Sequence, residues 1–69
     1  MSRTELKVFR VKQGLSQKQM AEKLDYSRGH YVRFESGEAE TTLRFLQALE
    51  TAFGLSFEEA QAVMKRDKE

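Results

Sequence analysis

The chain contains no cysteine, so neither a disulfide nor a thiolate metal site can support its fold. It has a single histidine and no carboxylates clustered in apolar surroundings, which leaves little from which to build an acid–base pair or a nucleophile. No apolar run approaches the roughly 20 residues of a membrane span, and the N-terminus lacks the apolar segment of a signal peptide. We therefore expect a cytoplasmic protein that is not an enzyme and has no metal, no cofactor and no membrane contact.

The length of the chain limits it to one domain, which we expect to span residues 1–69. A chain this short buries only about 60% of the surface that its unfolded form exposes. Its core is therefore small, and we expect the domain to be too small to enclose a small-molecule binding pocket in addition to that core.

The formal net charge of +1 conceals an uneven distribution. Residues 1–36 carry eight Lys and Arg against four acidic residues, whereas residues 37–69 carry four against seven. The N-terminal half has the charge to face phosphate groups, and the C-terminal half does not. Ordinary solvated helix faces are the alternative explanation.

Capping residues and glycines divide the chain into five short helices, and the absence of proline leaves them uninterrupted. Capping boxes, in which Ser is followed three residues later by Glu or Gln, are formed by Ser2 and Glu5, Ser16 and Gln19, and Ser56 and Glu59. The helices are predicted to begin after Ser2, Ser16, Ser27, Thr41 or Thr42, and Ser56. They are predicted to end before Gly14, near Leu24, before Gly37, before Gly54, and by fraying within residues 65–69.

Apolar residues recur at intervals of three and four, as on the buried face of a helix, and nowhere alternate as in a strand. The predicted core is Leu6, Phe9, Leu15, Met20, Ala21, Leu24, Tyr31, Phe34, Leu43, Leu46, Leu49, Phe53, Leu55, Phe57 and Val63. The sequence therefore predicts an all-α fold.

Residues 17–36 are the most informative stretch. Two predicted helices of about eight residues are joined by a turn of about three, so they should meet at a steep angle. In such a helix-turn-helix the first helix crosses the DNA backbone, and the second places its N-terminal residues in the major groove.

The sequence of this stretch resembles the Cro/repressor-type (XRE) helix-turn-helix family. The resemblance is carried by Gly14-Leu15-Ser16-Gln17, Met20-Ala21, Leu24, Ser27-Arg28, Arg33-Phe34-Glu35 and Gly37. Residues 49–59 resemble the fourth and fifth helices of that family, so the resemblance covers about residues 6–60. It implies a compact five-helix, lambda-repressor-like domain that binds double-stranded DNA.

The resemblance also implies roles for individual residues. Base contacts are expected from Arg28, Gly29, His30, Val32 and Arg33. Contacts to the DNA backbone are expected from Arg10, Ser16, Gln17, Lys18, Ser27 and Arg44. Arg10 and Glu35 match a family pair in which an ion pair ties two helices together beside the DNA.

Several of these roles have alternatives. An arginine such as Arg28 suits the paired acceptors of guanine, although it can also bind phosphate. Gly29 either lets the backbone approach the groove floor or is a tolerated surface glycine, and His30 either donates to DNA or simply faces solvent. Val32 suits a thymine methyl group, and Arg33 favours phosphate.

The chain departs from the family pattern in three places. Asp25 replaces the usual turn glycine, and Asp tolerates the left-handed conformation better than most residues. The acidic residues Glu38 and Glu40 occupy a loop that often carries basic residues, which weakens the grip on phosphate. Apolar residues occupy three positions that are usually polar, and they are either scattered surface residues or a partner surface. These residues are Val8, Val11 and Phe45.

The expected function is sequence-specific regulation of transcription, by a repressor that binds a palindromic operator as a homodimer. The candidate dimer surfaces are the last two helices with Phe45, Val63 and Met64, or the region around Phe53 and Phe57. The alternative is an antitoxin or accessory module that binds a protein partner, with DNA binding secondary. No pattern in the sequence identifies the operator, the target genes or the sign of regulation.

Overall fold

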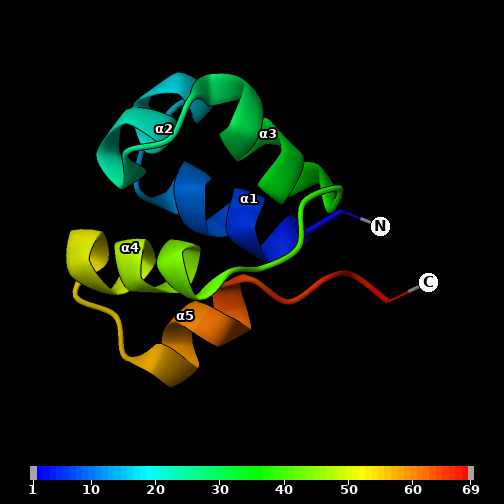
Figure 1. Cartoon of the computed structure of the whole chain (residues 1–69), viewed down its shortest axis with the longest axis vertical. Helices are drawn as coiled ribbons and strands as arrows, with labels where there is room; N and C mark the ends of the chain where they lie inside the picture. The colour runs from blue at the N-terminus through cyan, green and yellow to red at the C-terminus, as the bar shows by residue number, and fades with distance from the viewer. Residues whose placement is uncertain (1, 69) are drawn as a thin grey trace.

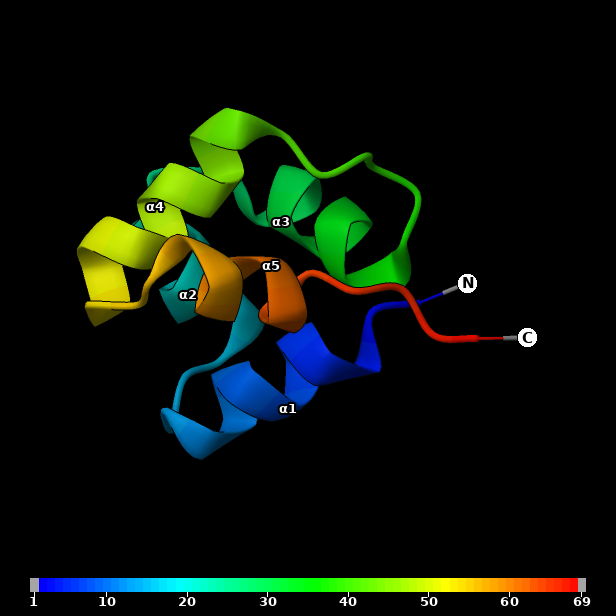
Figure 2. The same ribbon diagram turned by 90° about the horizontal axis from the view of Figure 1, so that it is seen from below.

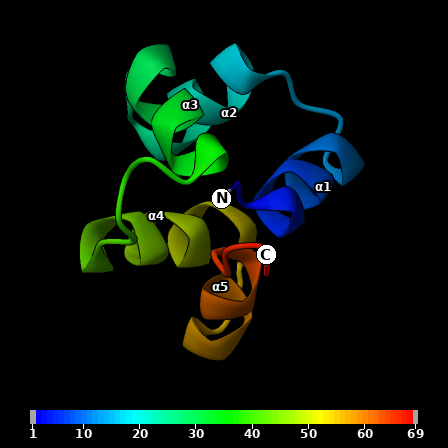
Figure 3. The ribbon, with the colours of Figure 1, turned by 90° about the vertical axis from the view of Figure 1, so that its right-hand side faces the viewer.

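Five α-helices make up the computed structural model, which describes residues 2–68 (Figure 1). They are α1 (Thr4–Lys12), α2 (Gln17–Leu24), α3 (Arg28–Ser36), α4 (Leu43–Phe53) and α5 (Phe57–Val63). Helices α2 and α3 lie on one side of the molecule and α4 and α5 on the other (Figures 1 and 3). Helix α2 packs directly against α4, and α1 packs beside them against α3 and α5. No strand occurs in residues 2–68, so the predicted all-α fold is confirmed.

Four of the five helices begin at the predicted capping residue. The side chains of Ser16, Ser27, Thr42 and Ser56 each accept a hydrogen bond from the backbone N–H three residues later. Each cap satisfies one of the N–H groups that a first helical turn leaves without a partner. The capping boxes predicted at Ser16 and Ser56 are complete, because the Gln19 and Glu59 side chains accept from the backbone N–H of the capping residue.

The turn between α2 and α3 depends on Asp25, which adopts the left-handed conformation with φ 63° and ψ 45°. A short polar side chain tolerates this conformation better than most residues do. The turn therefore survives the replacement of the usual glycine, as predicted.

The capping box predicted at Ser2 is wrong. Arg3 is the N-cap of α1 and its side chain makes no capping hydrogen bond. Asp67, near the C-terminus, supplies the capping hydrogen bond instead. One of its carboxylate oxygens accepts from the backbone N–H of Thr4 at 3.0 Å, and the other accepts from the Ser2 hydroxyl at 2.8 Å.

Helix α5 ends at Val63, before the region 65–69 in which it was expected to fray. Residues 65–68 run beside the first described residues, with the backbone N–H of Asp67 donating to the carbonyl of Ser2 at 2.9 Å (Figure 2), and Glu69 lies outside the described residues.

The predicted core needs five corrections in α4 and α5, one of which is Ala60, a fully buried residue that was not predicted. Phe45 is fully buried, with its ring stacked on Phe34 at a centroid distance of 4.0 Å, and Leu43 is 62% exposed. In α5, Met64 is buried just beyond the end of the helix, whereas Phe57 is 45% exposed. The residues that are buried and apolar are Leu6, Met20, Ala21, Leu24, Tyr31, Phe34, Phe45, Leu46, Leu49, Ala60 and Met64.

Arg3 is 1% exposed, and the sequence pattern did not reveal it. Its Nε donates to the backbone oxygen of Met64 at 2.9 Å, and its Nη1 donates to the backbone oxygen of Phe34. Its Nη2 donates to the hydroxyl of Thr41 at 3.2 Å. The carbonyls at the ends of α3 and α5 carry the negative end of the helix dipole, so both favour a cation, although that of Phe34 also accepts from the backbone N–H of Gly37 at 3.2 Å.

The charge of Arg3 is costly to bury. Desolvation, followed by the positive charge of Arg66, lowers the pKa of Arg3, while Glu40 acts in the opposite direction. The guanidinium nevertheless remains charged at neutral pH, because an arginine is not deprotonated in proteins. Its hydrogen bonds to the ends of two helices compensate for the lost hydration.

We expect Arg3→Met to lower the free energy of unfolding by about 2–4 kcal/mol, because buried carbonyl groups lose their donors. Chemical denaturation monitored by circular dichroism measures this loss. Lys65→Met, at an exposed position beyond α5, is the matched control and should change stability by less than about 0.5 kcal/mol. Equal stability of the two variants would contradict the role given to Arg3.

Candidate nucleic-acid interface

Helices α2 and α3 form the helix-turn-helix, with the same limits, residues 17–36, that the sequence predicts. Their contact is apolar and is formed by Met20, Ala21 and Leu24 of α2 with Tyr31 and Phe34 of α3. The backbone N–H of Tyr26 donates to the carbonyl of Ala21 at 2.9 Å and closes the turn. This packing fixes the direction of α3 relative to α2.

One side of α3 faces the core and the other faces solvent. Tyr31, Phe34 and Glu35 are buried, whereas Gly29 and Arg33 lie on the opposite side and are exposed. The buried side faces α4, because the ring of Phe34 stacks on that of Phe45, so the exposed side faces away from α4. Helix α3 is therefore held by its inner side chains while its outer ones remain accessible.

The five candidate base-contacting residues do not all point the same way. Arg28 is exposed and lines a hollow at the start of α2, and Val32 is half-buried in a second hollow against α1. The ring of His30 stacks on Phe34 at 5.0 Å and meets the edge of Tyr26 at 5.0 Å. His30 thus lies on the flank of α3 that faces α4, apart from Arg28.

The fold itself gives no reason for the glycine at position 29. Its φ is not positive, and an added Cβ would meet no heavy atom of the described residues within 4 Å beyond its own helix and neighbours. A glycine this near the start of a helix loses stability relative to alanine. Within the protein, nothing requires a glycine at this position, so a structural reason for it has to come from a bound partner.

The candidate phosphate-contacting residues form two groups. Ser16, Gln17 and Lys18 surround the N-terminus of α2, whose first N–H groups have no helical acceptors and suit an anion. Arg28 lines the same hollow. On the opposite flank the guanidinium of Arg44 lies 5.0 Å above the ring of Tyr26. Ser27 stands between the two groups, and its hydroxyl caps α3.

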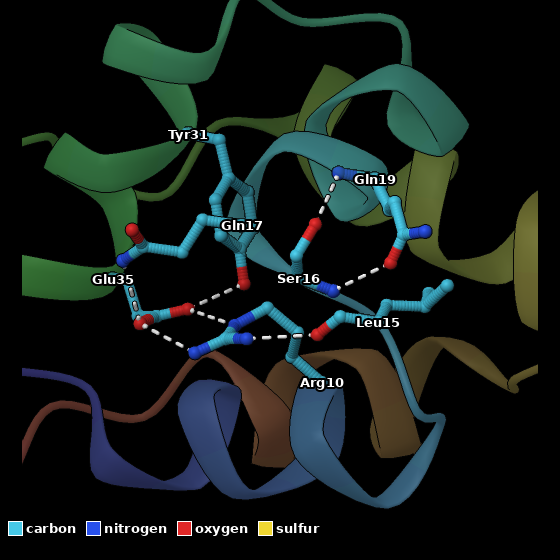
Figure 4. A network of polar contacts seen from close by, with 7 residues as sticks. All are labelled: Arg10, Leu15, Ser16, Gln17, Gln19, Tyr31 and Glu35. Carbon is cyan, nitrogen blue, oxygen red and sulfur yellow. Dashed lines mark hydrogen bonds and ion pairs between the residues drawn. The ribbon is translucent and has the colours of Figure 1, made fainter.

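The carboxylate of Glu35 is the centre of a buried polar network (Figure 4). Arg10 of α1 donates to it from Nε at 2.9 Å and from Nη2 at 3.5 Å. The Tyr31 hydroxyl donates at 2.7 Å, and the side-chain amide of Gln17 donates at 3.2 Å. Arg10 also donates from Nη1 to the carbonyl of Leu15 at 2.8 Å. The ion pair expected between Arg10 and Glu35 is thus present and joins α1, α2 and α3.

The network shifts the pKa values of its members. Burial alone would raise the pKa of Glu35, but the hydrogen bonds from Arg10, Tyr31 and Gln17 outweigh it, so the pKa is lowered from 4.5. Burial and the hydrogen bond to Glu35 raise the pKa of Tyr31, which remains a neutral donor. The hydrogen bond to Glu35 raises the pKa of Arg10. All three groups therefore hold the protonation states that the hydrogen bonds require at neutral pH.

Comparison with models of protein families identifies the family to which this helix-turn-helix belongs. A family model described as Helix-turn-helix matches residues 6–59, which is most of the chain. The chain belongs to the Cro/repressor-type (XRE) helix-turn-helix family. It is accordingly a DNA-binding regulator of transcription, and the family domain is a binding module and not an enzyme. We found no match among curated proteins or among solved structures.

Two further observations concern the part of this XRE domain that the structure describes. None of the helices in residues 2–68 is long and apolar enough to cross a membrane. Within the same residues, no three His, Asp or Glu side chains are grouped so that they can hold a metal ion.

Arg10 lines the same hollow as Ser16, Gln17, Lys18 and Arg28, but most of its side chain is occupied within the domain. The residue is 9% exposed, and its guanidinium donates to Glu35 and to Leu15. Gln17 is likewise engaged through its side chain, although its backbone N–H belongs to the first turn of α2. Arg10 holds the helix-turn-helix together through these contacts, its contact with phosphate stays a prediction, and the neighbouring Lys18 is exposed.

The acidic loop after α3 has arginine partners that the sequence did not reveal. Arg66, beyond α5, lies 3.1 Å from Glu40 and donates to the carbonyl of Gly37 at 3.0 Å. The Nε of Arg33, on the outer side of α3, lies 3.8 Å from Glu38. Both acidic residues are thus matched within the domain by a positive charge from another segment.

We expect Glu35→Ala to lower the free energy of unfolding by about 3–5 kcal/mol, because it leaves the buried Arg10 without its counter-ion. Thermal melting measures the effect. Glu22→Ala, which removes an exposed acidic side chain from α2, is the control and should cost less than about 0.5 kcal/mol. A melting temperature that is unchanged in Glu35→Ala would contradict the structural role of the pair.

The lowered pKa of Glu35 also sets a pH dependence. Because the folded-state pKa lies below the unfolded one, the stabilisation is complete well above pH 4.5 and is lost as the pH falls below that value. We expect the stability difference between the wild type and Glu35→Gln to shrink from pH 7 to pH 3, as measured by urea denaturation. A difference that stays constant over this range would exclude ionised Glu35 as its source.

Proposed function

We propose that the protein is a sequence-specific transcriptional repressor that places α3 in the major groove of double-stranded DNA. One observation carries the proposal: the outer side of α3, with Arg28, Gly29 and Arg33, is exposed next to the N-terminus of α2. An α-helix fits the major groove of B-DNA, and a helix N-terminus favours a phosphate. A helix-turn-helix presents both at once.

In this proposal the exposed residues of α3 read the bases. Arg28 donates to the two acceptors of a guanine, a contact worth about 1–3 kcal/mol of discrimination. Gly29 lets the backbone of α3 approach the groove floor, and Val32 meets a thymine methyl group. Arg33 contacts a base or a phosphate further along α3, and His30 contacts DNA from the flank on which Phe34 holds it.

Contacts to the DNA backbone fix the position of the domain but carry no sequence information themselves. We assign them to the N-terminus of α2, to the cap of α3 and to the start of α4. The residues are Ser16, Gln17, Lys18, Ser27 and Arg44. They come from both flanks of the N-terminus of α3, so they hold that end against the duplex.

A single domain of this size makes few base contacts, so we propose that two copies bind a palindromic site. Half-sites about one helical turn apart multiply the affinity without new contacts in either copy. Phe45 and Met64 are buried and drop out of the expected dimer surface. Phe57, which belongs to the second expected surface, is exposed on α5, and the exposed Leu43 on α4 joins the candidate dimer surface. A dimer that covers such a site blocks access to it, which favours repression.

Selection of bound sequences from a pool of random duplexes tests this function. We expect enrichment of a two-fold symmetric site, and we expect Arg28→Ala to relax the preference at one position in each half-site. Enrichment of an asymmetric site would refute the palindrome and the dimer. Recovery of unenriched sequences would refute sequence-specific recognition.

Gly29→Ala separates DNA recognition from folding. Because an added methyl group meets open space in the protein, we expect the melting temperature to stay the same or to rise slightly. We expect affinity for the selected site to fall about tenfold, equivalent to about 1.4 kcal/mol, because the methyl group holds α3 away from the groove floor. Unchanged affinity in an electrophoretic mobility assay would mean that Gly29 is a tolerated surface glycine.

A second candidate function is the binding of a protein partner, as by an antitoxin or an accessory module. It is favoured by Val8 and Val11, which are 39% and 57% exposed on the outer side of α1. Phe45 no longer supports it, because it is buried. The salt dependence of DNA binding distinguishes the two functions: a DNA regulator loses affinity steeply as salt rises, whereas a partner-binding module binds DNA weakly at every salt concentration.

A further inference from the structure

Arg33 and Glu38 form an exposed ion pair at the edge of the face that carries the proposed function. The Nε of Arg33 lies 3.8 Å from a carboxylate oxygen of Glu38, and the two side chains are 65% and 69% exposed. Arg33 stands on the outer side of α3, and Glu38 follows the end of that helix at Gly37. The carboxylate therefore occupies a position that a DNA phosphate would also favour.

The neighbouring Glu40 is held differently. Its carboxylate lies 3.1 Å from Arg66, which comes from the segment after α5 and also donates to the carbonyl of Gly37. This pair ties the loop to the C-terminal segment and involves no residue of α3. Two acidic residues of one loop thus pair with arginines in different places, and only Glu38 pairs with an arginine on the outer side of α3.

We propose that Glu38 is an internal competitor for Arg33, which must exchange the carboxylate for a DNA acceptor when the duplex binds. The inference rests on the function proposed above and adds a residue that sets the strength of DNA binding. Because the pair is exposed on both sides, it is weak enough to be exchanged at little cost. The exchange lowers affinity for every duplex.

The competition has a defined electrostatic consequence. A cation that neutralises a phosphate displaces condensed counterions from the duplex, and each such contact adds about 0.9 to the slope of log affinity against log salt concentration. While Glu38 holds Arg33, that contact is made only in part. Freeing Arg33 strengthens binding and steepens the salt dependence together.

A double-mutant cycle of Glu38→Gln and Arg33→Gln tests the proposal. Affinities are measured for the selected duplex and for a random duplex of equal length, at several salt concentrations. We expect Glu38→Gln to raise affinity for both duplexes about two- to fivefold at low salt, as for an exposed pair, and to steepen the salt slope. In the Arg33→Gln background the same change should have little effect, because the residue for which it competes is gone.

Glu40→Gln is the matched control in the same loop. It removes the same charge but leaves Arg33 paired, so we expect it to alter affinity less than Glu38→Gln does. The nitrogen NMR signal of the Arg33 side chain adds a readout without DNA. It should shift in Glu38→Gln and stay in place in Glu40→Gln.

The outcomes separate this inference from the proposed function. An equal gain from Glu38→Gln with and without Arg33 would show general repulsion of the duplex and overturn the competition. An Arg33 signal that does not respond to Glu38→Gln, or unchanged affinity in that variant, would also overturn it. Wild-type protein with no salt-dependent affinity for any duplex would instead refute the proposed function, and the inference with it.

Discussion

The fold depends on a single buried carboxylate that three helices share. Glu35 of α3 accepts from Arg10 of α1, from Gln17 of α2 and from Tyr31 one turn earlier in its own helix. Loss of any donor leaves a charge or a polar group without its partner in a domain with a small core. The hydrogen bonds that hold the three helices together therefore also fix the orientation of α3 relative to α1 and α2.

The two ends of the chain secure the same, C-terminal end of α3 on which Glu35 lies. Arg3 donates to the carbonyl of Phe34 near the end of the helix, and Arg66 donates to the carbonyl of Gly37 just beyond it. Both residues lie outside the range matched by the family model. The C-terminal end of α3 is thus held by both terminal segments as well as by the Glu35 network, and the exposed side chains at its N-terminal end take no part in these contacts.

This separation explains the chemistry of the exposed face. The buried side of α3 holds Tyr31, Phe34 and Glu35, which the fold requires, whereas Gly29 and Arg33 contribute to no buried contact. Substitutions on the exposed side can therefore alter recognition without loss of the fold. The acidic residues of the loop after α3 are likewise paired with arginines of the domain.

The sequence alone determined the features that depend on neighbouring residues. The caps at Ser16, Ser27, Thr42 and Ser56 join residues three positions apart, so the limits of four helices and of the helix-turn-helix followed from local patterns. Only the tertiary structure decided that Asp67 caps α1, that Arg3 is buried and that Phe45 faces inward while Leu43 does not. The partners of Asp67 and Arg3 lie 31 to 65 residues away, and the rotation of α4 follows from its packing on Phe34, so no local spacing specifies these contacts.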